Sequence, residues 1–380
     1  MTWIMAKYRF EEFAINSTAK KKPVEEDKYT YLGLEHLDSG TLKVTRFGSE
    51  VAPIGEKLIM KKGDVLFGKR RAYQKKVAIA PFDGIFSAHG MVLRPNEELI
   101  DKDFFPLFIS SDYFLDAAIK ISVGSLSPTI NWRDLKVLEF ELPSLEEQRK
   151  LAKVLWAMND TIESYKKLIS TTNELVKSQF MEMFGNDERV PLKDFIEQVR
   201  GVSYKPKDLR DSNNESAVTL LRANNILNGV LNYDEVQHVA SEKVSDTQII
   251  KQGDILMCGS SGSLEHVGKA AICTPESYGM TFGAFCKLIR PKGKLLPLFI
   301  AGYFASDEYR ETIMQLACGS NINNLKTEHI DNLLIPMPAD DKQEEFVTFV
   351  QQSNKSKLKL EQALAELTAT YKGIIAENLG

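Results

Sequence analysis

The stretch KKGDVLF at residues 61–67 returns as KQGDILM at 251–257, and this recurrence decides the architecture of the chain. Further landmarks return in the same order: FSAHGMVLRP at 86–95 as FGAFCKLIRP at 282–291, PLFI at 106–109 as PLFI at 297–300, and GSLSPTINWRDLKVLEFELP at 124–143 as GSNINNLKTEHIDNLLIPMP at 319–338. Two copies of so long a unit are two domains, because a solenoid needs several short stacked repeats. The sequence therefore predicts two similar halves, 1–185 and 186–380.

Each half opens with a region of mixed α/β pattern, residues 1–143 and 186–338. Short apolar runs between Gly, Pro and Asp, such as GDVLF at 63–67 and KVAIAP at 76–81, indicate strands and turns. Helical spacing of the apolar residues in 106–121 and 297–316 indicates helices that cover the sheets. We expect an α+β fold with two similar α/β domains.

Each half then ends in a long helical stretch, residues 144–185 and 339–380. The first contains no Gly or Pro before Gly185, and the second none before Gly373. Seam positions alternate spacings of four and three: Leu151, Leu155, Met158, Ile162, Tyr165, Ile169, Thr172 and Val176 in the first, and Phe346, Val350, Ser353, Lys357, Leu360, Leu364, Leu367 and Tyr371 in the second. This pattern predicts two helices of about forty residues, roughly 60 Å long, that pair as a coiled coil.

Three seam positions are polar: Thr172, Ser353 and Lys357. Polar residues in a seam commonly fix its register and partner at some cost in stability, which suits two helices chosen for each other. The alternative is that each apolar stripe lies on its own domain as a surface helix. The length of the stripes favours pairing, because each stripe is longer than the core of one domain.

Composition limits the class of protein. The chain has 380 residues, of which 43% are hydrophobic, enough for two or more cores. No run approaches eighteen apolar residues and the start MTWIMAKYRF lacks a signal sequence, so we expect a cytoplasmic protein without membrane contact. The four cysteines, Cys258, Cys273, Cys286 and Cys318, form no CxxC pair, which argues against a disulfide framework or a zinc site. A net charge of −4 argues against a chain that binds nucleic acid by overall charge attraction, so any DNA binding must come from local patches or from partners.

The strongest local charge signal is KLIMKKGDVLFGKRRAYQKKV at 57–77, where eight Lys and Arg residues accompany one acid, Asp64. Because GDVLF reads as a strand, residues 68–76 should form a loop at the sheet edge, where cations can reach phosphates or guanine edges. The candidate DNA-binding residues of this loop are Lys69, Arg70, Arg71, Tyr73, Lys75 and Lys76. A solvated basic hairpin is the alternative.

In the second half, the matching place holds MCGSSGSLEHVGKA at 257–270, with short polar residues instead of cations. Its glycines do not form the GxxxxGK[ST] pattern of a nucleotide site. The candidates for a second reading surface are Ser260, Ser261, Ser263, Glu265, His266 and Lys269. A smaller basic patch of Lys20, Lys21 and Lys22, with Lys205 and Lys207 at the analogous place, fits either phosphate contacts or solvated loops.

The search for catalytic motifs is negative. The sequence has no [DN]PP[YF] run of an amino-methyltransferase, no GxGxxG, HExxH or GxSxG, and no segment like a PD-(D/E)xK nuclease. The five histidines are isolated, so no metal site is expected. The pattern indicates a binding protein without catalytic residues. The alternatives are a methyltransferase or nuclease with built-in recognition domains, and a coiled-coil scaffold that does not contact DNA.

Taken together, these features resemble the specificity subunits of type I restriction-modification systems. The resemblance rests on GSLSPTINWRDLKVLEFELPSLEEQRKLAKVL at 124–155, on the KKGDVLF and KQGDILM pair, and on KSQFMEMFG at 177–185. The family's phrase at the helix entrance, a proline turn followed by Glu-Gln and a basic residue, is matched by Leu142, Pro143, Glu147, Gln148 and Arg149. The second copy keeps Pro338 and Gln343 but lacks the Glu before the Gln.

The resemblance implies target-recognition domains at 1–143 and 186–338, each reading one part of a split, asymmetric site in double-stranded DNA. The helices at 144–185 and 339–380 would pack antiparallel as a spacer. The implied partners are two modification subunits, which carry S-adenosylmethionine and methylate adenine, and restriction subunits, which translocate and cut DNA with ATP and magnesium. The chain itself would carry no cofactor.

Overall fold

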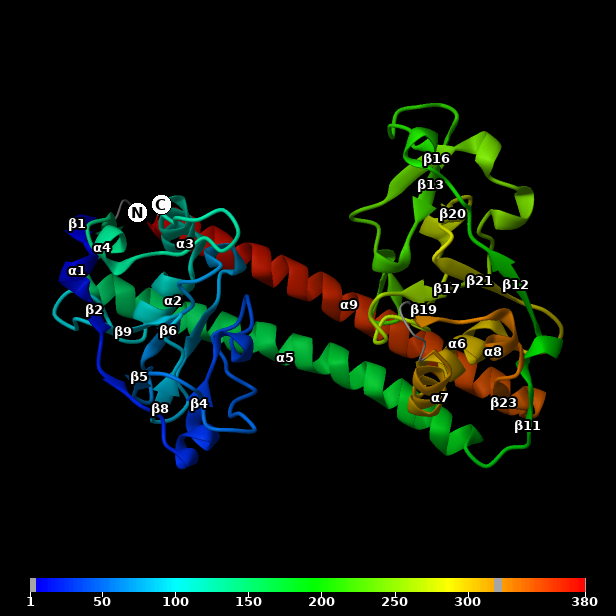
Figure 1. The fold of residues 1–380 in the computed structure, drawn as a ribbon, viewed down its shortest axis with the longest axis horizontal. Helices are drawn as coiled ribbons and strands as arrows, with labels where there is room; N and C mark the ends of the chain where they lie inside the picture. The colour runs from blue at the N-terminus through cyan, green and yellow to red at the C-terminus, as the bar shows by residue number, and fades with distance from the viewer. Residues whose placement is uncertain (1–4, 318–322, 380) are drawn as a thin grey trace. The chain divides into compact units, whose positions relative to one another are not determined.

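The computed structural model describes residues 5–317 and 323–379. The chain forms two compact units: unit 1 comprises residues 1–166 and 362–380, and unit 2 comprises residues 167–361. Two helices of 40 residues each, α5 (Leu145–Phe184) and α9 (Asp340–Leu379), contribute one end to each unit (Figure 1). At 1.5 Å per residue each helix is about 60 Å long.

Unit 1 contains two four-stranded sheets, with strand orders β2-β9-β6-β7 and β3-β5-β8-β4. All of their strand pairs are antiparallel except β4 with β8. Their bounds are β2 Ala14–Ser17, β9 Met91–Pro95, β6 Val65–Phe67, β7 Val77–Ile79, β3 Lys20–Lys21, β5 Lys57–Met60, β8 Gly84–Phe86 and β4 Tyr31–Leu32. The pair β1 (Ala6–Arg9) and β10 (Glu139–Leu142) precedes the entrance to α5, and the shorter helices are α1 Phe10–Phe13, α2 Phe105–Ser110, α3 Asp112–Lys120 and α4 Trp132–Leu135.

Unit 2 repeats this plan. Its four-stranded sheet has the order β12-β21-β17-β19, and a three-stranded sheet has the order β16-β13-β20 with β13 and β20 parallel. The bounds are β12 Ile196–Arg200, β21 Cys286–Pro291, β17 Ile255–Cys258, β19 Ala270–Ile272, β16 Gln237–Ala240, β13 Ala217–Leu221 and β20 Thr281–Phe282. The remaining elements are the strand pairs β11 Arg189–Pro191 with β23 Leu334–Pro336, β14 Ile226–Leu227 with β15 Val230–Leu231 and β18 Ser260–Ser261 with β22 Asn323–Asn324, and the helices α6 Pro297–Ala305, α7 Asp307–Ala317 and α8 Thr327–Asp331.

The recurring sequence landmarks meet in space within each unit. In unit 1, Arg94 donates from Nε and NH2 to the two carboxylate oxygens of the buried Asp64, at 2.7 and 2.9 Å. In unit 2, Arg290 makes the same two bonds to Asp254, both at 2.8 Å. A buried carboxylate is costly without a partner. The Gly-Asp of KKGDVLF and KQGDILM and the Arg-Pro of FSAHGMVLRP and FGAFCKLIRP, which we call the GD and RP landmarks, therefore recur together.

One predicted equivalence is wrong. The two PLFI runs suggested an offset of 191 residues, but the buried caps place the equivalent residues 195 apart: Ser111 caps α3 by accepting from Phe114 N, and Ser306 accepts from Tyr309 N ahead of α7. The runs are therefore one helical turn out of step. An apolar helical pattern looks alike after a shift of about one turn, so the sequence could not reveal the displacement.

A buried glutamine fixes the entrance of each long helix. Gln148 donates to the carbonyls of Leu99 and Pro143 at 3.0 and 2.8 Å and accepts from the Asp101 amide at 2.7 Å. Gln343 accepts from the Leu296 amide in the same way. This role explains why the glutamine is kept in the second copy although the preceding Glu is not, because each amide satisfies backbone groups that would otherwise be buried unpaired.

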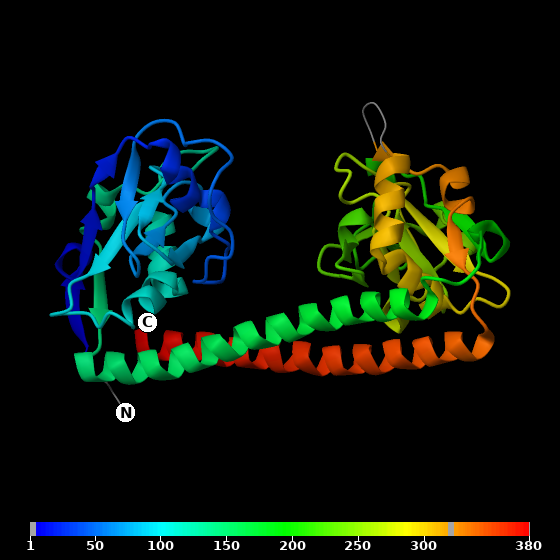
Figure 2. The same ribbon diagram turned by 90° about the horizontal axis from the view of Figure 1, so that it is seen from below.

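The long helices pack into the core of both units. In unit 1 the first turns of α5 share an apolar cluster with the last turns of α9, through Leu151, Leu155 and Ile375. In unit 2 the last turns of α5 share a cluster with the first turns of α9, through Phe180 and Phe346, whose rings lie 5.4 Å apart. The helices are therefore antiparallel (Figure 2). The predicted fold class, two mixed α/β domains with paired long helices, is confirmed.

Candidate nucleic-acid interface

The basic loop of unit 1 joins β6 to β7 and bonds to residues 128–130. Its ends are joined by the bond from Gly68 N to Lys76 O at 2.9 Å, and Ala72 is buried at its middle. Arg71 and Lys75 have positive φ values of 54° and 48°, a conformation that costs non-glycine residues energy and is often found at functional sites. The loop thus holds its exposed side chains on a defined backbone.

The Arg70 side chain of this loop is exposed and hydrogen-bonded. Its Nε donates to Ser127 Oγ at 3.0 Å, and its NH1 lies 3.4 Å from His89 Nε2. Its backbone amide donates to the carbonyl of His89 at 3.3 Å. Arg70 remains exposed, so its guanidinium is oriented before any ligand arrives.

Positive charges from separate segments act on the neighbours of Arg70. Burial, and then the charge of Lys20 on β3, lowers the pKa of Lys69. Burial, followed by the charges of Arg70, Lys69 and Lys57, lowers the pKa of His89. Such a concentration of positive charge raises the potential that an anionic backbone would meet. His89 and Lys57 are not among the predicted site residues, although His89 lies in the recurring segment 86–95 and Lys57 lies in the basic run 57–77.

The other predicted site residues of unit 1 either bind groups of the protein itself or are exposed. Lys75 Nζ lies 2.7 Å from carboxylate oxygens of both Asp112 and Asp116, and Lys76 Nζ donates to Leu34 O at 2.7 Å. Lys21 pairs with Asp27 at 3.0 Å, while Lys22, Arg71 and Tyr73 are exposed. Of the predicted set, Lys20, Lys69 and Arg70 share one neighbourhood.

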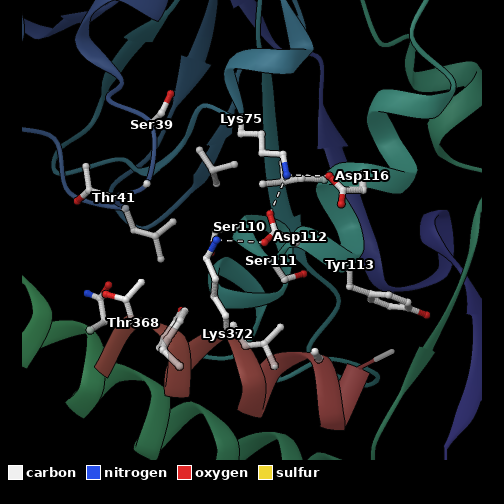
Figure 3. Close-up of a pocket in the computed structure, with 18 of the residues that line it drawn as sticks. Ser39, Thr41, Lys75, Ser110, Ser111, Asp112, Tyr113, Asp116, Thr368 and Lys372 are labelled. Atoms are coloured by element: carbon white, nitrogen blue, oxygen red, sulfur yellow. Dashed lines mark hydrogen bonds and ion pairs between the residues drawn. The ribbon is translucent and has the colours of Figure 1, made fainter. Parts of the chain in front are cut away.

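Lys75 faces a groove of about 880 Å³ within unit 1, lined by α3, the loop at 39–42 and the long helices. Figure 3 shows Lys75 directed toward Asp112 and Asp116, with Lys372 of α9 directed toward Asp112 from the other side at 3.5 Å. The hydrogen bond from Lys75, together with the charge of Lys372, lowers the pKa of Asp112. This network ties the domain to the helix pair and withdraws Lys75 from the cationic cluster.

The matching loop of unit 2 is held by α7. Tyr309 Oη donates to Gly268 O and Arg310 NH2 donates to Leu264 O, both at 2.7 Å. Ser260 and Ser261 are half-buried in β18, which pairs with Asn323–Asn324 of β22. The predicted residues Ser263, Glu265, His266 and Lys269 are exposed along the loop, and Lys205 and Lys207 are exposed beside Pro206.

The predicted seam residues of α5 and α9 show two levels of burial. Leu151, Leu155, Ile162, Phe346 and Val350 are buried, whereas Met158, Tyr165, Ile169, Thr172, Val176, Ser353, Leu360, Leu364, Leu367 and Tyr371 are half-buried. Lys357 is only 8% exposed and donates to Asn173 Oδ1 at 3.1 Å. A buried polar contact of this kind favours one register over its neighbours.

Within the described residues, no group of three or more His, Cys, Asp or Glu side chains could hold a metal ion. Burial raises the pKa of Cys273 to about 12 and raises those of Cys258 and Cys286, so these thiols are poor nucleophiles. Cys318 lies outside the described residues. In the part of the chain that the structure describes, no helix has the length and apolarity needed to cross a membrane.

The same backbone arrangement, which we call the backbone frame, therefore occurs in both units. The exposed loops that it carries differ between the units, and paired helices join the two copies. This arrangement defines a protein with two similar domains. The chain belongs to the family of the type I restriction modification DNA specificity domain, whose model matches residues 10–173 and 186–368. The two matched ranges correspond to the two halves of the repeat.

Specificity subunits of type I restriction enzymes are among the proteins similar to this chain. The specificity subunits of the type I restriction enzymes StySPI, from Salmonella potsdam, and EcoKI, from Escherichia coli strain K12, are each 34% identical to this chain over 176 residues, or 45% of its length. Each match covers 38% of the relative's own length. The crystal structure of a type I restriction-modification system S subunit from M. genitalium shares the fold, with a TM-score of 0.56, 13% identity, and coverage of 100% of this chain and 96% of that one.

Proposed function

We propose that the chain is the DNA-reading specificity subunit of a type I restriction-modification complex, with one half of a split DNA site read by each unit. The observation that carries the proposal is the pair of equivalent backbone frames with unlike loop chemistry. Arg70 N donates to His89 O and Ile130 N to Lys69 O in unit 1, and Ser260 N donates to Phe285 O and Leu325 N to Gly259 O in unit 2. Equal frames with different side chains suit an asymmetric bipartite site.

The chain acts in this proposal by binding alone. It directs two modification subunits, which supply S-adenosylmethionine and methylate adenine, and restriction subunits, which supply the ATP- and magnesium-dependent translocation and cleavage. A net charge of −4 on the chain fits shared contacts, because the partners would contribute phosphate neutralisation around the DNA. The long helices α5 and α9 offer exposed faces on which such partners can assemble.

Two alternatives make different predictions. A methyltransferase or nuclease with built-in recognition domains should bind S-adenosylmethionine or a metal ion as the isolated chain. A scaffold that does not contact DNA should leave the complex's DNA binding insensitive to the Arg70 cluster. The charge of Lys20 acts on Lys69, and those of Lys57, Lys69 and Arg70 act on His89. This concentration of positive charge favours the DNA-reading role over the scaffold.

Mapping methylated adenines in the genome of cells with and without this gene tests the proposal. We expect one bipartite motif, with adenines modified in both half-sites, to be methylated only when the gene is present. Deletion of the gene for the modification subunit is the matched control and should remove the same motif. If every methylated motif remains after the specificity gene is deleted, the proposal is contradicted.

A further inference from the structure

His89 and Phe285 occupy the same place in the two backbone frames. The carbonyl of His89 accepts from the amide of Arg70 at 3.3 Å, and that of Phe285 accepts from the amides of Ser260 and Gly259 at 3.0 and 2.9 Å. The two donors Arg70 and Ser260 are also equivalent, because each follows the buried strand that begins after a GD landmark. Phe285 therefore stands where unit 1 presents a side chain of its cationic cluster.

The chemistry at this place changes from polar to apolar. In unit 1, His89 lies against the guanidinium of Arg70, whereas in unit 2 a short hydroxyl residue, Ser260, takes the place of the arginine. The ring of Phe285 is 68% exposed, which makes it the most exposed large apolar side chain in the described part of unit 2. At this exposure the ring of Phe285 is accessible to an apolar group of a ligand.

The backbone that carries Phe285 is fixed on both sides. Gly283 N donates to Leu221 O at 2.9 Å, and Cys286 N donates to Gly283 O at 2.8 Å. The next side chain, Cys286, is 1% exposed and anchors the start of β21 in the core. Because the backbone that carries the ring is held in place, a contact between the ring and a ligand costs little conformational entropy.

We propose that Phe285 reads DNA by contacting the 5-methyl group of a thymine in the major groove. This inference rests on the proposed function and adds the chemistry read at one position. A phenylalanine ring can neither donate nor accept a conventional hydrogen bond, and the thymine methyl is the one apolar group that base pairs present in the major groove. The hydroxyls of Ser260 and Ser261 lie on the adjacent strand β18, where they can supply hydrogen bonds to neighbouring base edges.

The proposal also explains how one frame reads two different half-sites. At the shared place, unit 1 presents Arg70 and His89, which suit the acceptor atoms of guanine, and unit 2 presents Phe285, which suits a methyl group. Sequence specificity then changes by substitution at fixed positions and leaves the backbone as it is.

The test removes the methyl group from the DNA and the ring from the protein separately. The complex of this chain with its modification subunits is bound to its mapped site, and deoxyuridine replaces each thymine in turn, which deletes only the 5-methyl group. We expect one replacement to weaken binding by the wild-type complex about fourfold, the transfer free energy of one buried methyl group. The same replacement should have no effect on the Phe285→Ala complex, because a double-mutant cycle isolates the shared contact.

Two control variants define the result. Phe285→Leu keeps an apolar side chain and should keep part of the response to deoxyuridine. Leu334→Ala, at a 52% exposed position on β23 of the same unit, should respond as the wild type does. Both this variant and Phe285→Ala should melt at the wild-type temperature, since the side chains are exposed.

The outcomes separate this inference from the proposed function. The inference would be overturned if the wild-type complex prefers its site but the Phe285→Ala complex responds to every deoxyuridine replacement as the wild type does. The proposed function would then still stand. An equal loss on all DNA sequences for Phe285→Ala would also overturn it, because that result describes a non-specific contact. A wild-type complex without sequence preference would overturn the proposed function itself.

Discussion

The variant Arg70→Ala is expected to weaken DNA binding by the assembled complex by roughly 1–3 kcal/mol, which is about 5- to 150-fold. The guanidinium is held by Ser127 at 3.0 Å and lies near His89, so it meets the DNA already oriented. A bidentate contact with guanine would confine the loss to one base pair of one half-site. A phosphate contact would instead weaken all sequences and reduce the salt slope by about one.

Fluorescence anisotropy on labelled duplexes at two salt concentrations distinguishes these outcomes. Lys75→Ala is the matched control in the same loop, because its ammonium group is paired with Asp112 and Asp116 and should contribute less to DNA binding. An affinity for the Arg70→Ala complex that equals the wild type at both salt concentrations would remove this loop from the interface.

Lengthening both long helices by one heptad should lengthen the unspecified spacer between the half-sites. Insertions after Lys166 in α5 and after Glu361 in α9 fall where the chain passes from one unit to the other, so each unit keeps its own core. Seven residues add about 10 Å of helix while turning its face by only about 20°, so the seam can continue. At about 3.4 Å per base pair, the spacer should grow by up to roughly three base pairs, and by less if the helices lie oblique to the DNA.

The methylated motif written by the lengthened protein is the measurement. An insertion in α5 alone is the control, and it should weaken assembly because seam residues such as Tyr165 and Ile169 then lose their register with α9. An active complex with both insertions that still writes the original spacer would show that the helices do not set the distance between half-sites.

Much of the fold followed from the sequence because its features are periodic or repeated. The heptad seam predicted both long helices, and the recurring GD and RP landmarks predicted equivalent sheets, in which Asp64 binds Arg94 and Asp254 binds Arg290. The PLFI equivalence was wrong because an apolar helix resembles itself after one turn. The role of Gln148 was also hidden, since its backbone partners Leu99 and Asp101 lie far from it along the chain.

Less of the candidate interface followed from the sequence. The density of cations located the loop at 68–76, but the pairing of Lys75 with Asp112 depends on a helix that is remote in sequence. The same holds for Lys76, whose partner is the carbonyl of Leu34. His89 and Phe285 are single residues at the same place of the recurring segments 86–95 and 282–291, and the paired hydrogen bonds show that they are structurally equivalent.

If each unit reads its own half of the DNA site, exchanging one domain should change one half-site alone. Residues 1–141 are replaced by the matching domain of a related specificity subunit with a known motif, and the methylated adenines are mapped in cells that carry the chimera. We expect a hybrid motif in which one half-site comes from the donor subunit and the other half-site is unchanged. A chimera that assembles and methylates DNA but changes both half-sites, or neither, would contradict this expectation.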